Sequence, residues 1–170
     1  FQNDDANNTV KNSILTGANS TAASGLIVFW NAIPATGNGN SNNTINNNDI
    51  GANGNNPLAT AIYSNDANNR GNSGNTITNN NIYNWNTNGI SVPAQATAAA
   101  AGATNNWTIT DNSFYNNLST APSTAQTAIN FVPTATSNGN TISNNSIGGN
   151  APGNTGTWTN TGAVAFTGIA

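Results

Sequence analysis

The 170-residue sequence contains no cysteine, no histidine, no methionine and no glutamate. These absences exclude disulfide bonds, thiol chemistry, a histidine general base and metal sites built from Cys and His. Charge is almost as scarce, because five Asp stand against two basic residues, Lys11 and Arg70, for a net charge of −3. Two basic residues cannot form the patch that nucleic acid requires, and no apolar run reaches the roughly 18 residues of a membrane span. We therefore expect no nucleic-acid partner and no membrane insertion.

Asparagine is the residue that the chain has in excess, with 40 copies, roughly a quarter of the sequence. A polar, charge-poor composition is often typical of disorder. Here, however, β-branched residues recur at fixed offsets, which disordered tracts lack, so we expect an ordered fold. The low charge also leaves little repulsion between copies of the chain and favours association.

One phrase occurs five times: Thr, apolar, polar, Asn or Asp, polar, polar, apolar. Its first apolar residues are spaced by 35, 32, 32 and 33 residues. They are Val10, Ile45, Ile77, Ile109 and Ile142, and the second apolar residues are Leu15, Ile50, Ile82, Phe114 and Ile147. Repetition at such a period is the signature of a repeat architecture. The repeats lie near 7–41, 42–73, 74–104, 105–137 and 138–170.

The two apolar positions of each phrase are five residues apart, so one straight strand would place them on opposite faces. A bend between two short strands turns both inward, and Asn tolerates the left-handed conformation that such a bend needs. Stacked repeats would align the bend residues in a column interrupted by Asp111. We predict a ladder of hydrogen-bonded side-chain amides there, formed by Asn12, Asn47, Asn79 and Asn144.

A second phrase, small–apolar–any–apolar, lies between the copies of the first and indicates a third strand in each repeat. Its predicted inward column is Leu26, Ile62, Ile90, Ile129 and Val164. A three-strand repeat cannot bury its own apolar face and must stack on its neighbours. The sequence therefore predicts an all-β fold: a parallel β-helix, or solenoid, of about five long coils with three short strands per coil, forming a single module over 1–170.

The phrase Asn-Thr-Ile-x-Asn-Asn-x-Ile, followed by Gly-Ile-x-Val, resembles the right-handed parallel β-helix of pectate lyases and many bacterial surface proteins. Its Asn/Thr/Gly-rich, charge-poor form is similar to repeats of large secreted bacterial adhesins. The resemblance implies a right-handed coil and an extracellular or cell-surface location.

Polysaccharide lyases and hydrolases with this fold use clustered Asp with Arg or Lys, often with calcium. Asp49 and Asp111 are the nearest equivalent here, but they lie about two coils apart, roughly 10 Å. They fit better as a solvent-facing neighbour of the bend and as a replacement for a ladder Asn. We expect no catalytic residue, no metal, no cofactor and no enzymatic activity.

Two outward features remain. Several aromatic residues fall outside the predicted columns and suit loop packing, a protein interface or glycan binding. They are Trp30, Tyr63, Trp85, Trp107 and Trp158. A column of Thr residues also faces outward, one per coil, beginning at Thr9. A flat Thr array is similar to ice-binding solenoids, but a single column is too narrow to favour that function.

The ends of the predicted solenoid carry no visible polar cap, although an open end exposes unpaired strand edges and core. The sequence begins with the first phrase of a repeat and ends with the second phrase of a repeat, so another copy placed after Ala170 would continue the same order of strands. Such ends suit either one module of a longer tandem protein or separate subunits that stack. We therefore expect an extracellular structural subunit whose partner is another copy, stacked head to tail in a filament, fibre or stalk. The alternative is a carbohydrate-binding or adhesin module, or a catalytically inactive polysaccharide-lyase-like β-helix, with glycans as partners. The predicted stacking residues are Val10, Leu15, Leu26, Ile142, Ile147, Val164, Phe166 and Ile169.

Overall fold

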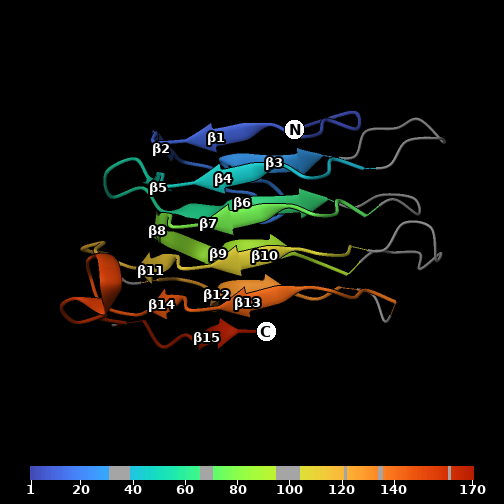
Figure 1. The fold of residues 1–170 in the computed structure, drawn as a ribbon. Helices are drawn as coiled ribbons and strands as arrows, with labels where there is room; N and C mark the ends of the chain where they lie inside the picture. Colours follow the sequence, from blue (N-terminus) through green and yellow to red (C-terminus); the bar gives the residue numbers. More distant parts are fainter. Residues whose placement is uncertain (31–38, 66–70, 95–103, 121, 134–135, 161) are drawn as a thin grey trace.

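The computed structural model of the chain describes residues 1–30, 39–65, 71–94, 104–120, 122–133, 136–160 and 162–170. Its strands form three parallel sheets of five strands each. Arg70, one of the two basic residues, lies outside the described residues. Figure 1 shows the strands stacked in layers, with the N-terminus beside the first layer and the C-terminus beside the last.

The first sheet consists of β1 (Thr9–Lys11), β4 (Thr44–Asn46), β7 (Thr76–Thr78), β10 (Thr108–Thr110) and β13 (Thr141–Ser143). The second consists of β2 (Ile14–Gly17), β5 (Asp49–Ala52), β8 (Asn81–Tyr83), β11 (Ser113–Tyr115) and β14 (Ser146–Ile147). The third consists of β3 (Ile27–Trp30), β6 (Leu58–Asn65), β9 (Trp85–Val92), β12 (Gln126–Phe131) and β15 (Phe166–Ile169). A short 3-10 helix, η1 (Pro152–Asn154), packs beside β11.

Neighbours within each sheet are three strands apart in the chain, so the chain returns to the same sheet after every third strand. This winding confirms the predicted parallel β-solenoid with three strands per coil. Of the five coils that we predicted, three lie between two others and are enclosed on both sides. The first and last coils form the outer edges of the three sheets within the described chain, and Gln2 bridges Trp30 at the edge of β3.

The first two predicted core columns are confirmed by the strand registers. Val10 pairs with Ile45, which pairs with Ile77, and the line continues through Ile109 to Ile142. The second column runs in the same way through Leu15, Ile50, Ile82, Phe114 and Ile147. In the three enclosed coils these side chains have no solvent exposure, because a neighbouring coil covers each of them above and below.

The third column differs from the prediction at both ends. Ile27 pairs with Ile62, and Ile129 pairs with Ile169, so the column contains Ile27 and Ile169 in place of Leu26 and Val164. Ile62, Ile129 and Ile169 share the local pattern Thr, Gly or Ala, then Ile, which the segment around Val164 lacks. Leu26 precedes β3 and packs half-buried against the core, and Val164 precedes β15.

Each strand of the first sheet lies between two sharp corners, and a residue with positive φ forms each corner. The corner after the strand contains the predicted bend residues, with φ near +55° at Asn12, Asn47, Asn79, Asp111 and Asn144. The corner before the strand contains Asn7, Asn42, Gly74, Asn106 and Gly139, also with positive φ. The sequence alternates Asn with Gly there because few other residues tolerate this conformation.

The residue that follows each corner turns its side chain into the solenoid. After the corner that ends each strand of the first sheet, these residues form a buried amide ladder. The backbone N–H of Asn48 donates to Asn80 Oδ1 at 3.0 Å, and that of Asn80 donates to Asn112 Oδ1 at 3.0 Å. The ladder begins at Ser13 and ends at Asn145. Each side-chain amide also donates to a core-strand carbonyl of the preceding coil, as Asn80 does to Ile45 at 2.9 Å.

This continuous ladder lies one residue beyond the predicted one. Among the predicted members, Asn47 Nδ2 donates to Asn12 Oδ1 at 2.8 Å on the surface, the one side-chain bond that joins them in the described chain. The corner residues use their left-handed conformation to make the turn, and this leaves their side chains outside. The following Asn then points inward, where backbone groups would otherwise lack partners.

A matching ladder follows the first corner, the one that precedes each strand of the first sheet. The N–H of Asn8 donates to Asn43 Oδ1 at 2.9 Å, and the N–H of Asn43 donates to Asn75 Oδ1 at 2.9 Å. Trp107 takes the next position, and its own N–H donates to Asn140 Oδ1 at 2.9 Å. Apart from β10, where Trp107 replaces the amide, each strand of the first sheet is therefore held by polar side chains at both of its ends.

Replacing a ladder amide should destabilise the fold far more than replacing the corner residue before it. In Asn80→Ala, the N–H of Asn48 and the carbonyl of Ile45 lose buried partners, at about 1–3 kcal/mol for each unsatisfied group. We expect urea denaturation to show a loss of at least about 2 kcal/mol in the free energy of unfolding. Asn79→Gly keeps the positive φ and should stay within about 0.5 kcal/mol of the wild type. Equal losses in the two variants would contradict a structural role for the ladder.

Candidate functional site

The aromatic residues predicted to contact a surface partner divide into two groups. Trp85 is 1% exposed and Trp107 is fully buried, so neither can contact a ligand from the surface. Trp158 packs half-buried against the core. Trp30 is 41% exposed and Tyr63 is half-buried, so these two remain accessible. The prediction of a surface contact is therefore wrong for Trp85 and Trp107, because both side chains pack in the core.

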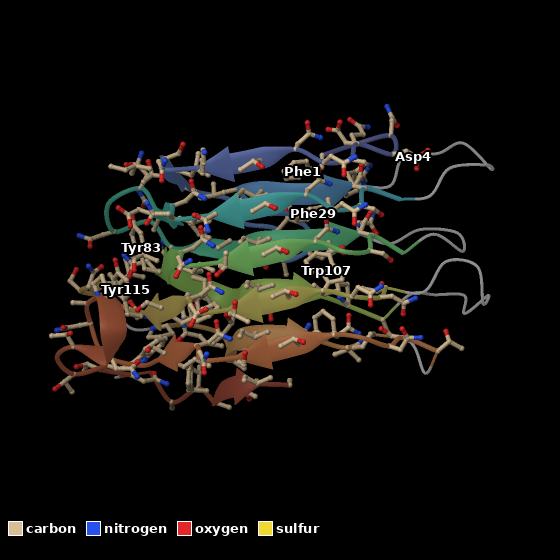
Figure 2. All side chains as sticks on the ribbon, in the orientation of Figure 1. Phe1, Asp4, Phe29, Tyr83, Trp107 and Tyr115 are labelled. Carbon is tan, nitrogen blue, oxygen red and sulfur yellow. The ribbon has the colours of Figure 1, made fainter. Side chains whose placement is uncertain are left out.

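Trp107 occupies an Asn position of the first-corner ladder and reproduces one of its contacts. Asn75 Nδ2 donates to the carbonyl of Asn40, and the Trp107 indole N–H donates to the equivalent carbonyl of Asn72 one coil later. The ring then fills core space against Phe29, with ring centroids 5.2 Å apart. Figure 2 shows Phe1, Phe29 and Trp107 following one another along the stack. The sequence analysis missed the burial of Trp107 because it placed this residue outside the predicted core columns.

Tyr83 and Tyr115 form a stacked pair on the outward side of the second sheet, which the sequence analysis did not single out as a site. Their ring centroids are 5.3 Å apart and their planes differ by 11°. The strand register aligns both with Gly51, where a Cβ atom would approach the Tyr83 ring to 2.4 Å. The absence of a side chain at Gly51 thus lets the Tyr83 ring pack against the backbone of β5. Asp49 lies on the same face and accepts a hydrogen bond of 2.7 Å from Asn81.

The tyrosine pair is electrostatically coupled to Asp49. Burial and the Asp49 charge raise the pKa of Tyr83. Burial, then Tyr83 and Asp49, raises the pKa of Tyr115 to about 12. Both phenols therefore remain neutral hydrogen-bonding groups at physiological pH. Nothing in this pair supplies a nucleophile or a general base near neutrality.

The raised pKa of Tyr115 predicts a loss of stability at alkaline pH. Its contribution is fully present below the unfolded value near 10, and it is lost as pH rises through the folded value of about 12, because the unfolded chain then releases the proton more readily. We expect the melting temperature to fall between pH 10 and 12, and to fall less in Tyr115→Phe. Ultraviolet absorbance titration should show one tyrosine ionising near pH 12. Equal alkaline slopes for the variant and the wild type would contradict this assignment.

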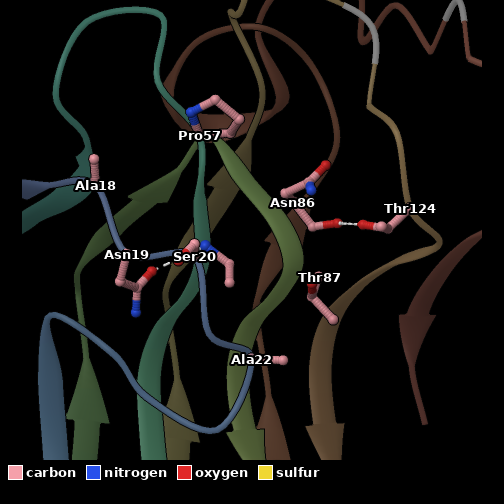
Figure 3. Close-up of a pocket in the computed structure, with 9 residues that line it drawn as sticks. Ala18, Asn19, Ser20, Ala22, Pro57, Asn86, Thr87 and Thr124 are labelled. Carbon is pink, nitrogen blue, oxygen red and sulfur yellow. Dashed lines mark hydrogen bonds between the residues drawn. The ribbon is translucent and has the colours of Figure 1, made fainter.

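A shallow cavity of about 300 Å³ lies beside the N-terminal ends of strands β6, β9 and β12 of the third sheet. Figure 3 shows its lining: the loop after β2 with Asn19, the start of β6, and Asn86 and Thr87 of β9, with Thr124 beside them. Asn19 Oδ1 accepts from the N–H of Ala59 at 2.9 Å, and the Thr124 hydroxyl donates to the Asn86 carbonyl. The lining is neutral and holds no aromatic ring on which a sugar could stack.

The Asp residues do not converge on a catalytic or metal site in the described chain. No group of three or more potential ligand residues occurs there. Asp111 adopts the corner conformation predicted for a replacement of a ladder-region Asn. Asp4 Oδ1 accepts from the N–H of Gly39 at 2.9 Å, which is a structural use of that carboxylate. The described residues also contain no helix with the length and hydrophobicity needed to cross a membrane.

The two end faces are the largest departure from a closed core. At the first end, the predicted residues Val10, Leu15 and Leu26 are half-buried, whereas their enclosed counterparts are covered. At the other end Ile142, Ile147 and Val164 are half-buried. Phe166 is 39% exposed and Ile169 is 52% exposed. All eight predicted stacking residues therefore lie in the first or last coil and remain at least partly accessible.

Part of the first end face is covered by the chain itself. Phe1 stacks on Phe29 with ring centroids 4.8 Å apart, and the N–H of Trp30 donates to the Phe1 carbonyl at 2.8 Å. Gln2 forms a parallel bridge with Trp30. These contacts cover the second half of the β3 edge. The Phe1 amino group also donates to the Val28 carbonyl at 3.0 Å, so within the described chain the edge without a neighbouring segment is at Ile27.

Comparisons with protein-family models, with curated proteins and with solved structures found no match for this chain. The β-solenoid fold therefore rests on the strand registers, and membership of the pectate-lyase-like superfamily stays a prediction from the repeated phrase.

Proposed function

We propose that this chain is a structural β-solenoid whose end faces bind another copy, head to tail, in an extracellular filament, fibre or surface stalk. The observation that carries this proposal is that the first and last coils present residues of the same apolar columns in the same register. Ile142 is half-buried and Ile169 is 52% exposed, although the equivalent residues inside the stack are covered. Exposed strand edges of this kind are templates for pairing with another chain.

The two faces are complementary in position as well as in chemistry. A copy placed beyond the last coil would bring Val10 over Ile142 and Leu15 over Ile147, so the first two columns would continue without a break. In the third sheet, Ile169 would lie beside Ile27, next to the part of the β3 edge that Phe1 and Gln2 cover. The contact adds strands by backbone hydrogen bonds, and apolar columns set the register.

The symmetry of this contact determines the assembly. Opposite ends of the molecule meet, so the interface is heterologous, and a translation along the solenoid axis does not close into a ring. The product is an open filament. Electrostatics do not oppose it, because residues 112–170 contain no charged side chain.

The proposed extracellular or cell-surface location is supported by the resemblance to secreted adhesin repeats. Immunolabelling of intact producing cells tests the location, and labelling that appears only after permeabilisation would contradict it. We propose no enzymatic activity. The glycan-binding alternative has less support, because two of the expected aromatics are buried and the cavity lacks a stacking ring.

Electron microscopy of the purified 170-residue chain over a range of concentrations tests the stacking. We expect filaments with an axial repeat of five strand spacings, roughly 24 Å. Ile169→Lys should abolish them, because a buried lysine without a partner would interrupt the joined third column. Asn55→Lys, which adds the same charge at an exposed loop position after β5 in the second coil, should still form filaments. Uniform single particles of the wild type at the highest concentration would contradict the proposal.

A further inference from the structure

The first sheet presents two outward columns of side chains, where the sequence analysis recognised one. The first column is Thr9, Thr44, Thr76, Thr108 and Thr141. The second, two residues further along each strand, is Lys11, Asn46, Thr78, Thr110 and Ser143. In the enclosed coils both columns are partly exposed, whereas the Ile between them is fully buried. The array is therefore two residues wide, and β7 and β10 read Thr-Ile-Thr whereas β4 reads Thr-Ile-Asn.

This face is rigid and regular. Its strands pair without a register shift, and each lies between two left-handed corners. An inward polar side chain follows both corners in every strand except β10, where Trp107 follows the first. Its side chains therefore repeat at two fixed distances, about 4.8 Å between strands and about 6.7 Å between residues i and i+2. Threonine adds stiffness because its β-branched side chain has few χ1 rotamers. Thr110 Oγ1 donates to Thr78 Oγ1 at 3.3 Å, which fixes the hydroxyls of neighbouring coils relative to each other.

The chemistry of the face is neutral and mixed. Lys11, in the first coil, is the one charged residue in the two columns. No protein hydrogen bond is recorded for the first-column hydroxyls in the described part of the chain, so they face solvent as donors and acceptors. Each Thr also presents a methyl group beside its hydroxyl. The result is a two-dimensional lattice of hydroxyls and methyls, about 19 Å long over its four strand spacings.

A rigid lattice of this kind recognises another lattice better than it recognises a single molecule. We propose that the first sheet binds the surface of ice. Oxygen positions on faces of hexagonal ice repeat at two distances close to those of the Thr array. The hydroxyls would hold water in matching positions, and the methyls would exclude water that does not fit. Because the array is already ordered, binding would require little further loss of side-chain entropy.

Two other occupants fit the face less well. A crystalline polysaccharide would favour aromatic rings for stacking, and neither outward column contains one. A second protein copy would favour aromatic, Met or Arg residues at the centre of the contact, and these too are absent from the two columns. The proposed ice face lies on the side of the solenoid and does not depend on stacking at the ends. Stacking in register would only lengthen the array.

Thermal hysteresis and ice recrystallisation assays on the purified chain test the proposal. We expect the wild type to show a freezing-point hysteresis gap, to shape ice crystals and to inhibit recrystallisation. The double variant Thr76→Tyr/Thr108→Tyr should lose all three effects, because two large rings at the centre break the flat array. Tyrosine keeps a high strand propensity, so the coil should still form. Thr16→Tyr, at an exposed position of β2 on the second sheet, is the matched control and should keep full activity.

Circular dichroism and melting temperatures of all three proteins establish that each variant is folded. Three results would overturn the proposal. One is the absence of hysteresis and of recrystallisation inhibition in the folded wild type at its highest soluble concentration. The second is full activity in the folded double variant. The third is binding of a different partner through this face. This would be seen as a wild-type dimer in light scattering that the double variant loses, or as binding to crystalline chitin or cellulose without binding to ice.

Discussion

Satisfying the backbone at its corners is the constraint on which the rest of this structure depends. A coil that turns sharply before and after each short strand directs N–H and C=O groups toward an apolar interior. Buried polar groups without partners are costly, and an inward Asn offers an acceptor and donors at the same point. Asn80 shows the complete pattern, since it accepts from Asn48 above, donates to the Ile45 carbonyl and donates to Asn112 below. The Asn-rich composition is thus a folding requirement repeated in every coil.

Trp107 shows which part of that requirement is essential. Its indole N–H reaches the same carbonyl position that an Asn side chain serves in the neighbouring coil. The ladder can therefore exchange an amide for another donor when the extra ring volume finds a place in the core, here against Phe29 and Phe131. The same ring explains why a tryptophan in a polar phrase need not be a surface contact.

Both proposed functions arise from the periodicity that the ladders impose. Along the axis, columns that continue unchanged to the end faces make each end a template for another coil. On the side, the corner geometry that turns Asn48 and its counterparts inward holds the Thr residues outward at regular intervals. Neither proposed function needs cysteine or histidine, which the chain lacks. The tyrosine pair over Gly51 and the neutral cavity add local packing and polar contacts without a charged or nucleophilic centre near neutral pH.

The sequence by itself determined the fold class and the first two core columns, because the spacing of Thr, Ile and Asn is set by short-range corner chemistry. Asn or Gly at a left-handed position leaves few alternatives for the residues on either side. Only the tertiary structure decided that the buried ladder runs through Asn48 and Asn80, one residue beyond Asn47 and Asn79, since the inward direction follows from how two strands meet in space. It also decided the third column at Ile27 and Ile169, where connections of variable length separate the phrase from its neighbours and obscure the register. The burial of Trp85 and Trp107 and the second outward column beside Thr76 likewise depend on which coils lie above and below, and local sequence does not encode that contact.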